Sequence, residues 1–346
     1  MHVLIVRLSS MGDLVQTLPA LTDAVRAIPG IRFDWVVDES FVQVPAWHPS
    51  VDQVMPSGFR RWHQNWRQSL RRGEPQAFIK TLRGRKYDLI VDVQCEFKSA
   101  LAARLARGPR AGYDRRGVHE WGAQFAYQKR FSVPKGQHSI QRMRQLLSRA
   151  LEYEYSEREV DYGIDRSRLP ATTLALSKPY LVFIHSTSWS SKTWPEHYWQ
   201  GLTKTATQAG FSVVFPWGDE SERLRASRIA NGRERTIVLP QLSIAEKASI
   251  IRGARATVGL DTGLSHIAAA LDVPSVTIYG ATDPLLVGAT GQHQLQMAST
   301  FQCVKCHEQE CFYQGEAEFK PACLVELTPD RVWQSLQSLL NGVSAC

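Results

Sequence analysis

The chain has 346 residues, of which 43% are hydrophobic and 21% are charged. This length predicts two domains, and this much apolar surface excludes a chain that is mainly disordered. Gly and Pro follow no collagen-like period, and no apolar run reaches the ~20 residues that a membrane-spanning helix needs. The N-terminus lacks the basic start and the long apolar run of a secretory signal, so we expect a cytosolic protein.

The net charge of +8 is concentrated in one segment. Residues 60–86 contain nine Lys and Arg residues but only one acidic residue, Glu74. This segment alone therefore carries +8, and the rest of the chain sums to zero. Such a basic patch predicts an anionic partner, which is nucleic acid, an acidic lipid surface or a phosphorylated ligand.

The first half of the chain alternates strand and helix patterns. Residues 3–6 predict a short buried strand, which a polar turn at 9–13 separates from a helix that ends at Pro29 and Gly30. Further apolar runs predict strands at 33–37, 51–55 and 89–93. We expect the basic segment to be helical, with an apolar stripe formed by Trp62, Trp66, Leu70 and Phe78.

The second half repeats this alternation. Strands are predicted at 180–184, 211–215, 236–239, 257–260 and 276–279, and helices, for example, at 196–209 and 264–271. Strands separated by helices of this length predict an α/β fold with two doubly wound parallel sheets. The polar segment 155–178 places the boundary between domains 1–165 and 166–346. We expect the domains to face each other across a cleft, with ligands beyond the carboxyl ends of the strands.

The turn after the first strand contains a candidate catalytic acid. Gly12 permits a tight turn, and Asp13 follows it at the start of the helix. An aspartate here is a favoured helix cap and needs no other role. A carboxylate at a strand end that faces a cleft can also act as a general base on an attacking hydroxyl.

Two loops of the second half are candidate phosphate sites. Asp261 to His266 follow a strand and open a helix, where backbone N–H groups beside the small Gly263 suit a pyrophosphate. Residues 186–195 combine several hydroxyl groups with Lys192, which can neutralise a phosphate as a point charge. Capping turns and a solvated surface loop are the alternatives. No Walker motif or Asp-x-Asp pattern accompanies these loops, so we expect a phosphate held without a metal.

Four of the six cysteines lie within 21 positions near the end of the chain. They are Cys303, Cys306, Cys311 and Cys323. The first pair has the spacing of a zinc ribbon, and His307 is a possible substitute ligand. A large cytosolic chain keeps its thiols reduced, which favours a structural zinc or iron over disulfides, with free thiols as the other alternative.

The sequence resembles the lipopolysaccharide heptosyltransferases, in particular those of type I. The resemblance extends over most of the chain. It rests on the segments 3–13, 17–24, 33–37, 60–62, 192–195, 261–266 and 279–284. It implies a GT-B fold, with two Rossmann-like domains and a final helix, residues 328–341, that packs back on the first domain. It also implies inverting, metal-independent transfer of L-glycero-D-manno-heptose from ADP-heptose to the Kdo of the lipid A inner core, with no cofactor.

The resemblance also implies a role for each candidate residue. Asp13 would be the base that activates the Kdo hydroxyl. The donor ADP-heptose would be bound by Thr187, Ser188, Lys192, Glu222, Asp261, Thr262, Gly263, Leu264 and His266. The anionic acceptor would be bound by Arg60, Arg61 and His63. A lipid acceptor and a basic patch imply peripheral association with the cytoplasmic face of the inner membrane.

Other functions remain as alternatives. The four-cysteine tail is more like that of type II relatives, which add heptose to an inner-core heptose. A basic helix beside a cysteine-bound metal would also fit a nucleic-acid-binding protein, although no RRM, KH or helix-turn-helix signature is present. An NAD-dependent epimerase is disfavoured because residues 8–12 lack a Gly-x-Gly-x-x-Gly motif. We therefore expect ADP-heptose and a Kdo–lipid A acceptor as partners, and no nucleic acid.

Overall fold

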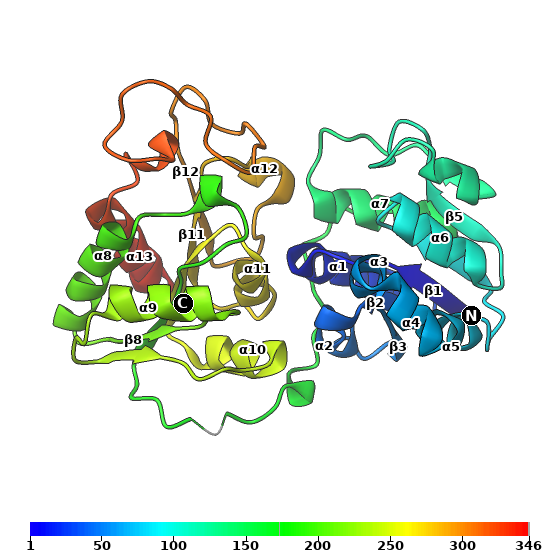
Figure 1. The fold of residues 1–346 in the computed structure, drawn as a ribbon, viewed down its shortest axis with the longest axis horizontal. Coiled ribbons are helices and arrows are strands. Elements are labelled where there is room, and N and C mark those ends of the chain that lie inside the picture. The colour runs from blue at the N-terminus through cyan, green and yellow to red at the C-terminus, as the bar shows by residue number, and fades with distance from the viewer. Residues whose placement is uncertain (173, 345–346) are drawn as a thin grey trace. The chain divides into compact units, whose positions relative to one another are not determined.

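Two compact α/β units make up the chain. The computed structural model describes residues 1–172 and 174–344, and these divide into units Met1–Arg168 and Leu169–Cys346. Each unit is built around a six-stranded parallel sheet with helices packed against it (Figure 1). The predicted α/β class with two doubly wound parallel sheets is therefore confirmed. In the part of the chain that is described, no helix is both long and apolar enough to cross a bilayer.

The first sheet has the strand order β3-β2-β1-β4-β5-β6. Its strands are β1 (His2–Val6), β2 (Arg32–Asp38), β3 (Val51–Ser57), β4 (Leu89–Asp92), β5 (Arg110–Tyr113) and β6 (Lys129–Phe131). Its helices are α1 (Met11–Ala27), α2 (Gln43–Ala46), α3 (Phe59–Gln64), α4 (Trp66–Arg71), α5 (Glu74–Leu82), α6 (Phe97–Leu105) and α7 (Ser139–Leu151), with short 3₁₀ turns η1 (Glu39–Phe41) and η2 (Ala123–Ala126). Residues 3–6 of β1 are fully buried, as expected for a central strand with both faces covered.

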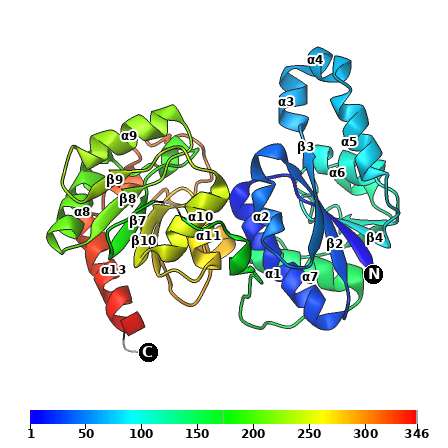
Figure 2. The ribbon, with the colours of Figure 1, turned by 90° about the horizontal axis from the view of Figure 1, so that it is seen from below.

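The basic segment is largely helical, as its sequence predicts, but it lacks the expected apolar stripe. It consists of α3, α4 and α5, which form an arm beyond the end of β3 (Figure 2). Breaks at Asn65 and at Gly73, which has a left-handed backbone (φ 68°), interrupt the helical phase. Trp62 packs edge-on against Phe59 and Phe78. The other two members of the expected stripe are exposed, since Trp66 and Leu70 retain 57% and 44% of their surface.

The second sheet has the order β12-β11-β10-β7-β8-β9. Its strands are β7 (Tyr180–Ile184), β8 (Ser212–Phe215), β9 (Thr236–Val238), β10 (Ala256–Leu260), β11 (Ser275–Tyr279) and β12 (Gln294–Ala298). Its helices are α8 (Glu196–Gln208), α9 (Glu220–Ala230), α10 (Ile244–Gly253), α11 (Gly263–Ala270), α12 (Pro284–Val287) and α13 (Pro329–Ser344). The 3₁₀ turns η3 (Arg166–Arg168), η4 (Ser190–Lys192) and η5 (Ala322–Leu324) complete the elements.

The final helix joins the core of the second unit. Val332, Trp333, Leu336 and Leu340 of α13 are buried in the same apolar cluster as Trp199 of α8, and the two helices lie side by side in Figure 1. The final helix therefore belongs to the second unit, and its expected packing on the first domain stays a prediction. The apolar stripe of α13 finds its partner in α8, which is next to it in the same unit.

Candidate active site

The polar loops gather at the point of each sheet where the strand order reverses. In the first unit this point lies between β1 and β4, and in the second it lies between β7 and β10. At such a point the two adjacent loops leave the carboxyl ends of their strands toward opposite faces of the sheet, which opens a crevice for a ligand. Asp13 follows β1, whereas Lys192 follows β7 and Asp261 follows β10.

Asp13 is an ionised carboxylate held in a fixed orientation. The sequence suggested that Asp13 caps the helix. In the structure Ser10 is the cap, and Asp13 is the third residue of α1. Its Oδ2 accepts hydrogen bonds from the Ser10 N–H (3.0 Å) and hydroxyl (2.8 Å), and its Oδ1 pairs with Arg7 Nη2 at 2.8 Å. Burial by itself would raise the pKa of Asp13, but Arg7 and the bonds from Ser10 outweigh it and lower that pKa. One third of the side chain stays exposed, so the charged group is accessible to a substrate.

Arg7 is a site residue that our assignment of roles from the sequence missed. It is buried, with 6% of its surface exposed, and its Nη1 donates to the Val93 carbonyl at 3.1 Å. The next residue, Leu8, donates its N–H to Gln94 Oε1 at 2.7 Å. The loop after β4 therefore fixes the guanidinium that in turn orients Asp13. A charged residue at the end of a buried apolar strand was the signal in the sequence, because such a charge requires a partner.

The turn that supports Arg7 is built around a second buried acid, Asp92. Its carboxylate accepts hydrogen bonds from the N–H groups of Gln94 (3.0 Å) and Cys95 (2.8 Å) and from the Tyr127 hydroxyl (2.6 Å). Burial nevertheless raises the pKa of Asp92 to about 6. Between pH 4 and 6 Asp92 is thus protonated in the folded protein but has lost its proton in the unfolded chain.

We therefore expect Asp92 to destabilise the fold as the pH rises through this window. Its contribution to the unfolding free energy should fall by about 1.4 kcal/mol per pH unit between pH 4 and 6. Urea denaturation across this range should show the loss, and Asp92→Asn should flatten it. The exposed Asp272 provides a control, because Asp272→Asn should leave the slope unchanged. An unaltered slope in Asp92→Asn would show that Asp92 titrates normally.

His119 is a further titratable group near Asp13. The pKa of His119 is lowered by desolvation and then by the charges of Arg7 and Arg142, while Asp13 acts in the opposite direction. His119 therefore lies within electrostatic reach of the candidate base. Arg142, on α7, stacks over the Tyr113 ring at 4.9 Å. A lowered pKa leaves His119 neutral at pH 7, so Arg7 and Arg142 are the cations here that suit an anionic acceptor.

The three predicted acceptor residues lie on α3, after β3. Arg60 and His63 are exposed. Arg61 is paired with two carboxylates, with its Nε 2.8 Å from Glu39 and its Nη1 2.5 Å from Glu74. These two acids neutralise Arg61, which ties α3 to η1 and α5. Arg60 and His63 are therefore the members of this group available to a ligand.

Asp261 is the centre of the polar cluster in the second unit. Its Oδ2 lies 2.7 Å from Lys192 Nζ and accepts a hydrogen bond from the Thr282 hydroxyl at 2.6 Å. Its Oδ1 is 3.7 Å from His266 Nε2, and its backbone carbonyl accepts from the Thr187 hydroxyl at 3.2 Å. Burial would raise the pKa of Asp261, but His266 and Lys192 hold it well below its usual range.

Lys192 is positioned by two neighbours. Besides the contact with Asp261, its Nζ lies 4.2 Å from the centre of the Trp189 ring, a cation–π contact. Only 15% of the Lys192 side chain is exposed, so its rotamer is well defined. Trp189 and Thr282 were not assigned roles from the sequence. Their positions in the loops after β7 and β11 were the available signal, since both loops flank that after β10.

The remaining predicted donor residues fall into two groups. Thr262 precedes α11, and Gly263 and Leu264 are its first residues, so free backbone N–H groups lie beside Asp261. Ser188 is exposed in the loop after β7. Glu222 belongs to α9, where its Oε2 accepts from the Gly218 N–H at 2.5 Å after β8. The structure joins Thr187, Lys192, Asp261 and His266 into one network, whereas Ser188 and Glu222 lie outside its contacts.

The four tail cysteines line one small cavity. Ser191, Ala281, Phe312, Tyr313 and Pro321 complete its wall. All four thiols are free, so the disulfide alternative is not what the structure contains. Cys346 lies outside the described residues.

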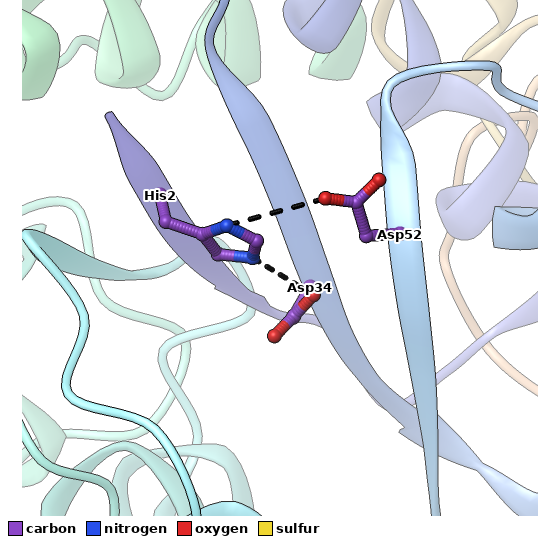
Figure 3. A group of neighbouring side chains, drawn as sticks. All are labelled: His2, Asp34 and Asp52. Carbon is purple, nitrogen blue, oxygen red and sulfur yellow. Dashed lines mark ion pairs between the residues drawn. The ribbon is translucent and has the colours of Figure 1, made fainter.

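A separate acidic group lies near the amino ends of the first three strands. His2 Nε2 is 2.9 Å from Asp34, and its Nδ1 is 4.0 Å from Asp52 (Figure 3). Arg85 lies 3.6 Å from Asp34, and Arg32 Nε donates to Asp52 at 2.8 Å. These cations compensate both carboxylates. The group is thus an ion-pair network that holds the strand ends together, at the opposite end of the sheet from Asp13.

Comparisons with known proteins identify the family of this chain. Glycosyltransferase family 9 (heptosyltransferase) matches residues 76–316. The chain belongs to this family. It is therefore a glycosyltransferase, and the resemblance to heptosyltransferases is confirmed.

Individual relatives extend the match to the whole chain. Lipopolysaccharide heptosyltransferase 1 of Pseudomonas aeruginosa is 45% identical, with 98% of each chain covered. The protein of that name from Escherichia coli K12 is 42% identical, with 85% of this chain and 92% of the relative covered. The solved E. coli heptosyltransferase WaaC with ADP matches at a TM-score of 0.86 and 38% identity, over 98% of this chain and all of that one. This match confirms the predicted GT-B class.

Proposed function

We propose that this glycosyltransferase moves L-glycero-D-manno-heptose from ADP-heptose to the Kdo of the lipid A inner core, with inversion and without a catalytic metal. Similarity to lipopolysaccharide heptosyltransferases 1 supports the reaction class. The similar E. coli enzyme has been solved with ADP and with ADP-2-deoxy-2-fluoro heptose, which supports the donor. The observation that carries the mechanism is the oriented, ionised carboxylate of Asp13.

Inversion requires a single displacement at the anomeric carbon. The acceptor hydroxyl attacks as the bond to ADP breaks, and Asp13 accepts its proton. A positioned base contributes about 10²–10⁴-fold to such a step. Arg7 lowers the basicity of Asp13 but keeps it charged at neutral pH, and it fixes the orientation of the carboxylate. Pairing with Arg7 therefore makes Asp13 a weaker base that is held in a fixed orientation.

The leaving diphosphate gains negative charge as the glycosidic bond breaks. In this proposal Lys192 and the N–H groups at the start of α11 stabilise that charge. Thr187, Ser188 and Thr262 to Leu264 contact the phosphates, Glu222 contacts the ribose, and Asp261 and His266 lie near the sugar. A phosphate that approaches Lys192 shares it with Asp261, which keeps the ammonium in place when the site is empty.

A surface of the first unit fits a lipid-linked acceptor. Four large apolar side chains of α6 and the neighbouring η2 segment retain about half or more of their surface. They are Phe97 (59%), Leu101 (49%), Trp121 (75%) and Phe125 (63%). Exposed aromatic groups beside basic side chains suit a membrane interface, and Arg130 stacks on Phe125. We propose on this basis that the protein associates with the cytoplasmic face of the inner membrane, which co-sedimentation with acidic phospholipid vesicles tests.

ADP release with defined acceptors tests the proposed function. We expect transfer to Kdo–lipid A, no transfer to an acceptor whose Kdo already carries heptose, and a rate that brief chelation does not reduce. Transfer only to the heptosylated acceptor would instead assign the type II reaction. Product analysis for the anomeric configuration tests inversion.

Acceptor binding by the arm predicts a separate effect. Arg60→Ala should raise the acceptor KM severalfold and leave the KM for ADP-heptose unchanged, because Arg60 is exposed on α3 of the first unit. Arg61→Ala should mainly loosen the arm, because this side chain already pairs with Glu39 and Glu74. Steady-state kinetics and limited proteolysis separate the two outcomes. Equal acceptor kinetics in Arg60→Ala and the unaltered protein would remove the arm from acceptor binding.

A further inference from the structure

The chemistry proposed above does not use the four tail cysteines. Cys303, Cys306, Cys311 and Cys323 come from a stretch of 21 residues in which the only regular element is η5. Their thiols nevertheless line the same cavity. A stretch with so little secondary structure depends on packing and on bonds to neighbouring loops, and a metal ion held by the four thiols would add to these.

Four thiols around one cavity form a ligand set for a soft metal ion. Thiolates bind zinc or iron in tetrahedral sites, and the Cys-x-x-Cys spacing of the first pair is typical of such sites. Four thiolates around one cavity repel one another, so a bound cation would stabilise their convergence. No three of the described cysteine sulfurs lie within 4.8 Å of one another, so binding would draw them inward.

The same stretch is bonded to the loop that carries Lys192. The Ser191 N–H donates to the Gln309 carbonyl at 3.1 Å, and the Ser191 hydroxyl donates to the Glu308 carbonyl at 2.5 Å. Ser190 adds a third bond, from its hydroxyl to the Gln309 carbonyl at 3.1 Å. Residues 308 and 309 lie between two of the cysteines. Fixing these cysteines therefore fixes the turn η4, which ends at Lys192.

The stretch also contacts the loop after β11. The Lys305 N–H donates to the Gly280 carbonyl and the His307 N–H to the Ala281 carbonyl, both at 2.8 Å. Lys305 Nζ lies 3.0 Å from Asp283. The neighbouring Thr282 donates to Asp261, the partner of Lys192. Trp189 precedes Ser190, and Asp261 accepts from Thr282, which follows Ala281. Each of the two groups that hold the Lys192 ammonium is therefore adjacent to a segment that is hydrogen-bonded to the cysteine stretch.

We propose that Cys303, Cys306, Cys311 and Cys323 bind one zinc or iron ion, and that this metal clamp positions the Lys192 loop for the donor diphosphate. The clamp acts through the backbone bonds from residues 305–309, and the metal does not contact the substrate. The metal site stands on the cysteines alone, whereas its effect on donor binding rests on the proposed function.

Metal analysis of the full chain tests the site, and ADP binding tests the clamp. Protein purified without added metal should contain about one zinc or iron per chain, as four thiolates require. Cys303→Ser with Cys306→Ser should lose that metal and weaken ADP binding on the order of tenfold, because misplacing a binding group is costly. Glu310→Gln is the matched control, since it alters an exposed residue of the same stretch and no sulfur. This control should keep both the metal and the affinity for ADP.

The outcomes separate the two parts of the proposal. The metal site would be overturned if the unaltered protein contained no stoichiometric metal and showed no thiolate-to-metal absorption when produced with cobalt. This test does not depend on whether the double variant folds. Metal loss with unchanged ADP affinity would overturn the clamp. If the unaltered protein binds metal but not ADP, the proposed donor is wrong and the metal site stands.

Discussion

Replacing Asp13 by Asn is expected to reduce heptose transfer by about 10²–10⁴-fold, the usual contribution of a general base. ADP binding should not change, because Asp13 belongs to the first unit and the donor residues to the second. Asn keeps the shape of the side chain and an oxygen that can accept from Ser10. It removes only the charge that pairs with Arg7 and accepts a proton. Single-turnover transfer and ADP titration measure the two properties.

The alternative role of Asp13 is to stabilise the start of α1, and it predicts a different result. A residue at this position that only satisfies backbone N–H groups contributes about 0.5–2 kcal/mol of stability and nothing to the rate. Ser10→Ala provides the matched control, since it removes the hydroxyl that donates to Asp13 and leaves the carboxylate. Both variants should unfold somewhat more easily. Near-normal transfer by Asp13→Asn would reduce Asp13 to this helix-start role.

The second large effect is expected at Lys192. Lys192→Met keeps the apolar stem over Trp189 but removes the ammonium, so kcat/KM should fall by about 10²–10³-fold, the usual loss for one group that stabilises developing charge. The loss should appear in kcat as well as in KM, because the diphosphate becomes more negative as the bond breaks. Steady-state kinetics with ADP-heptose as the varied substrate measure both constants.

Two further variants define the cause of that loss. Lys192→Arg keeps a charge but changes its shape, so it should recover part of the activity. Lys204→Met removes an exposed lysine of α8 and should leave transfer unchanged. A loss confined to KM in Lys192→Met would mean that Lys192 binds the ground state and the transition state equally. A loss as large in Lys204→Met would point to the overall charge of the protein.

The pattern of buried apolar runs predicted most of the fold. The predicted strands 3–6, 33–37 and 180–184 agree with β1, β2 and β7 within one residue. Strands buried on both faces need continuous apolar residues, so their signal is local. β5 and β6 were missed because they are short and include Arg110, Lys129 and Arg130. Only pairing with β4 and with each other makes these segments strands.

The arm shows where local periodicity misleads. Helical spacing grouped Trp66 and Leu70 with Phe78, yet only Phe78 is buried. Whether an apolar residue is buried depends on the phase of the helix and on the element that packs against it. The breaks at Asn65 and Gly73 reset that phase, and neither is visible in a simple count of spacing.

The alternation of strands and helices, the polar loops at strand ends and the spacing of the cysteines can all be read from the amino-acid sequence alone. These features depend on residues close together in the chain. Tertiary structure decided that Arg7 pairs with Asp13, that Asp261 joins Lys192 to Thr282, and that four cysteines line one cavity beside the Lys192 loop. Each of these contacts joins turns or loops that are separate in the chain. The order of strands in each sheet decides which loops meet, and the meeting loops decide the charge, burial and hydrogen bonding of each side chain.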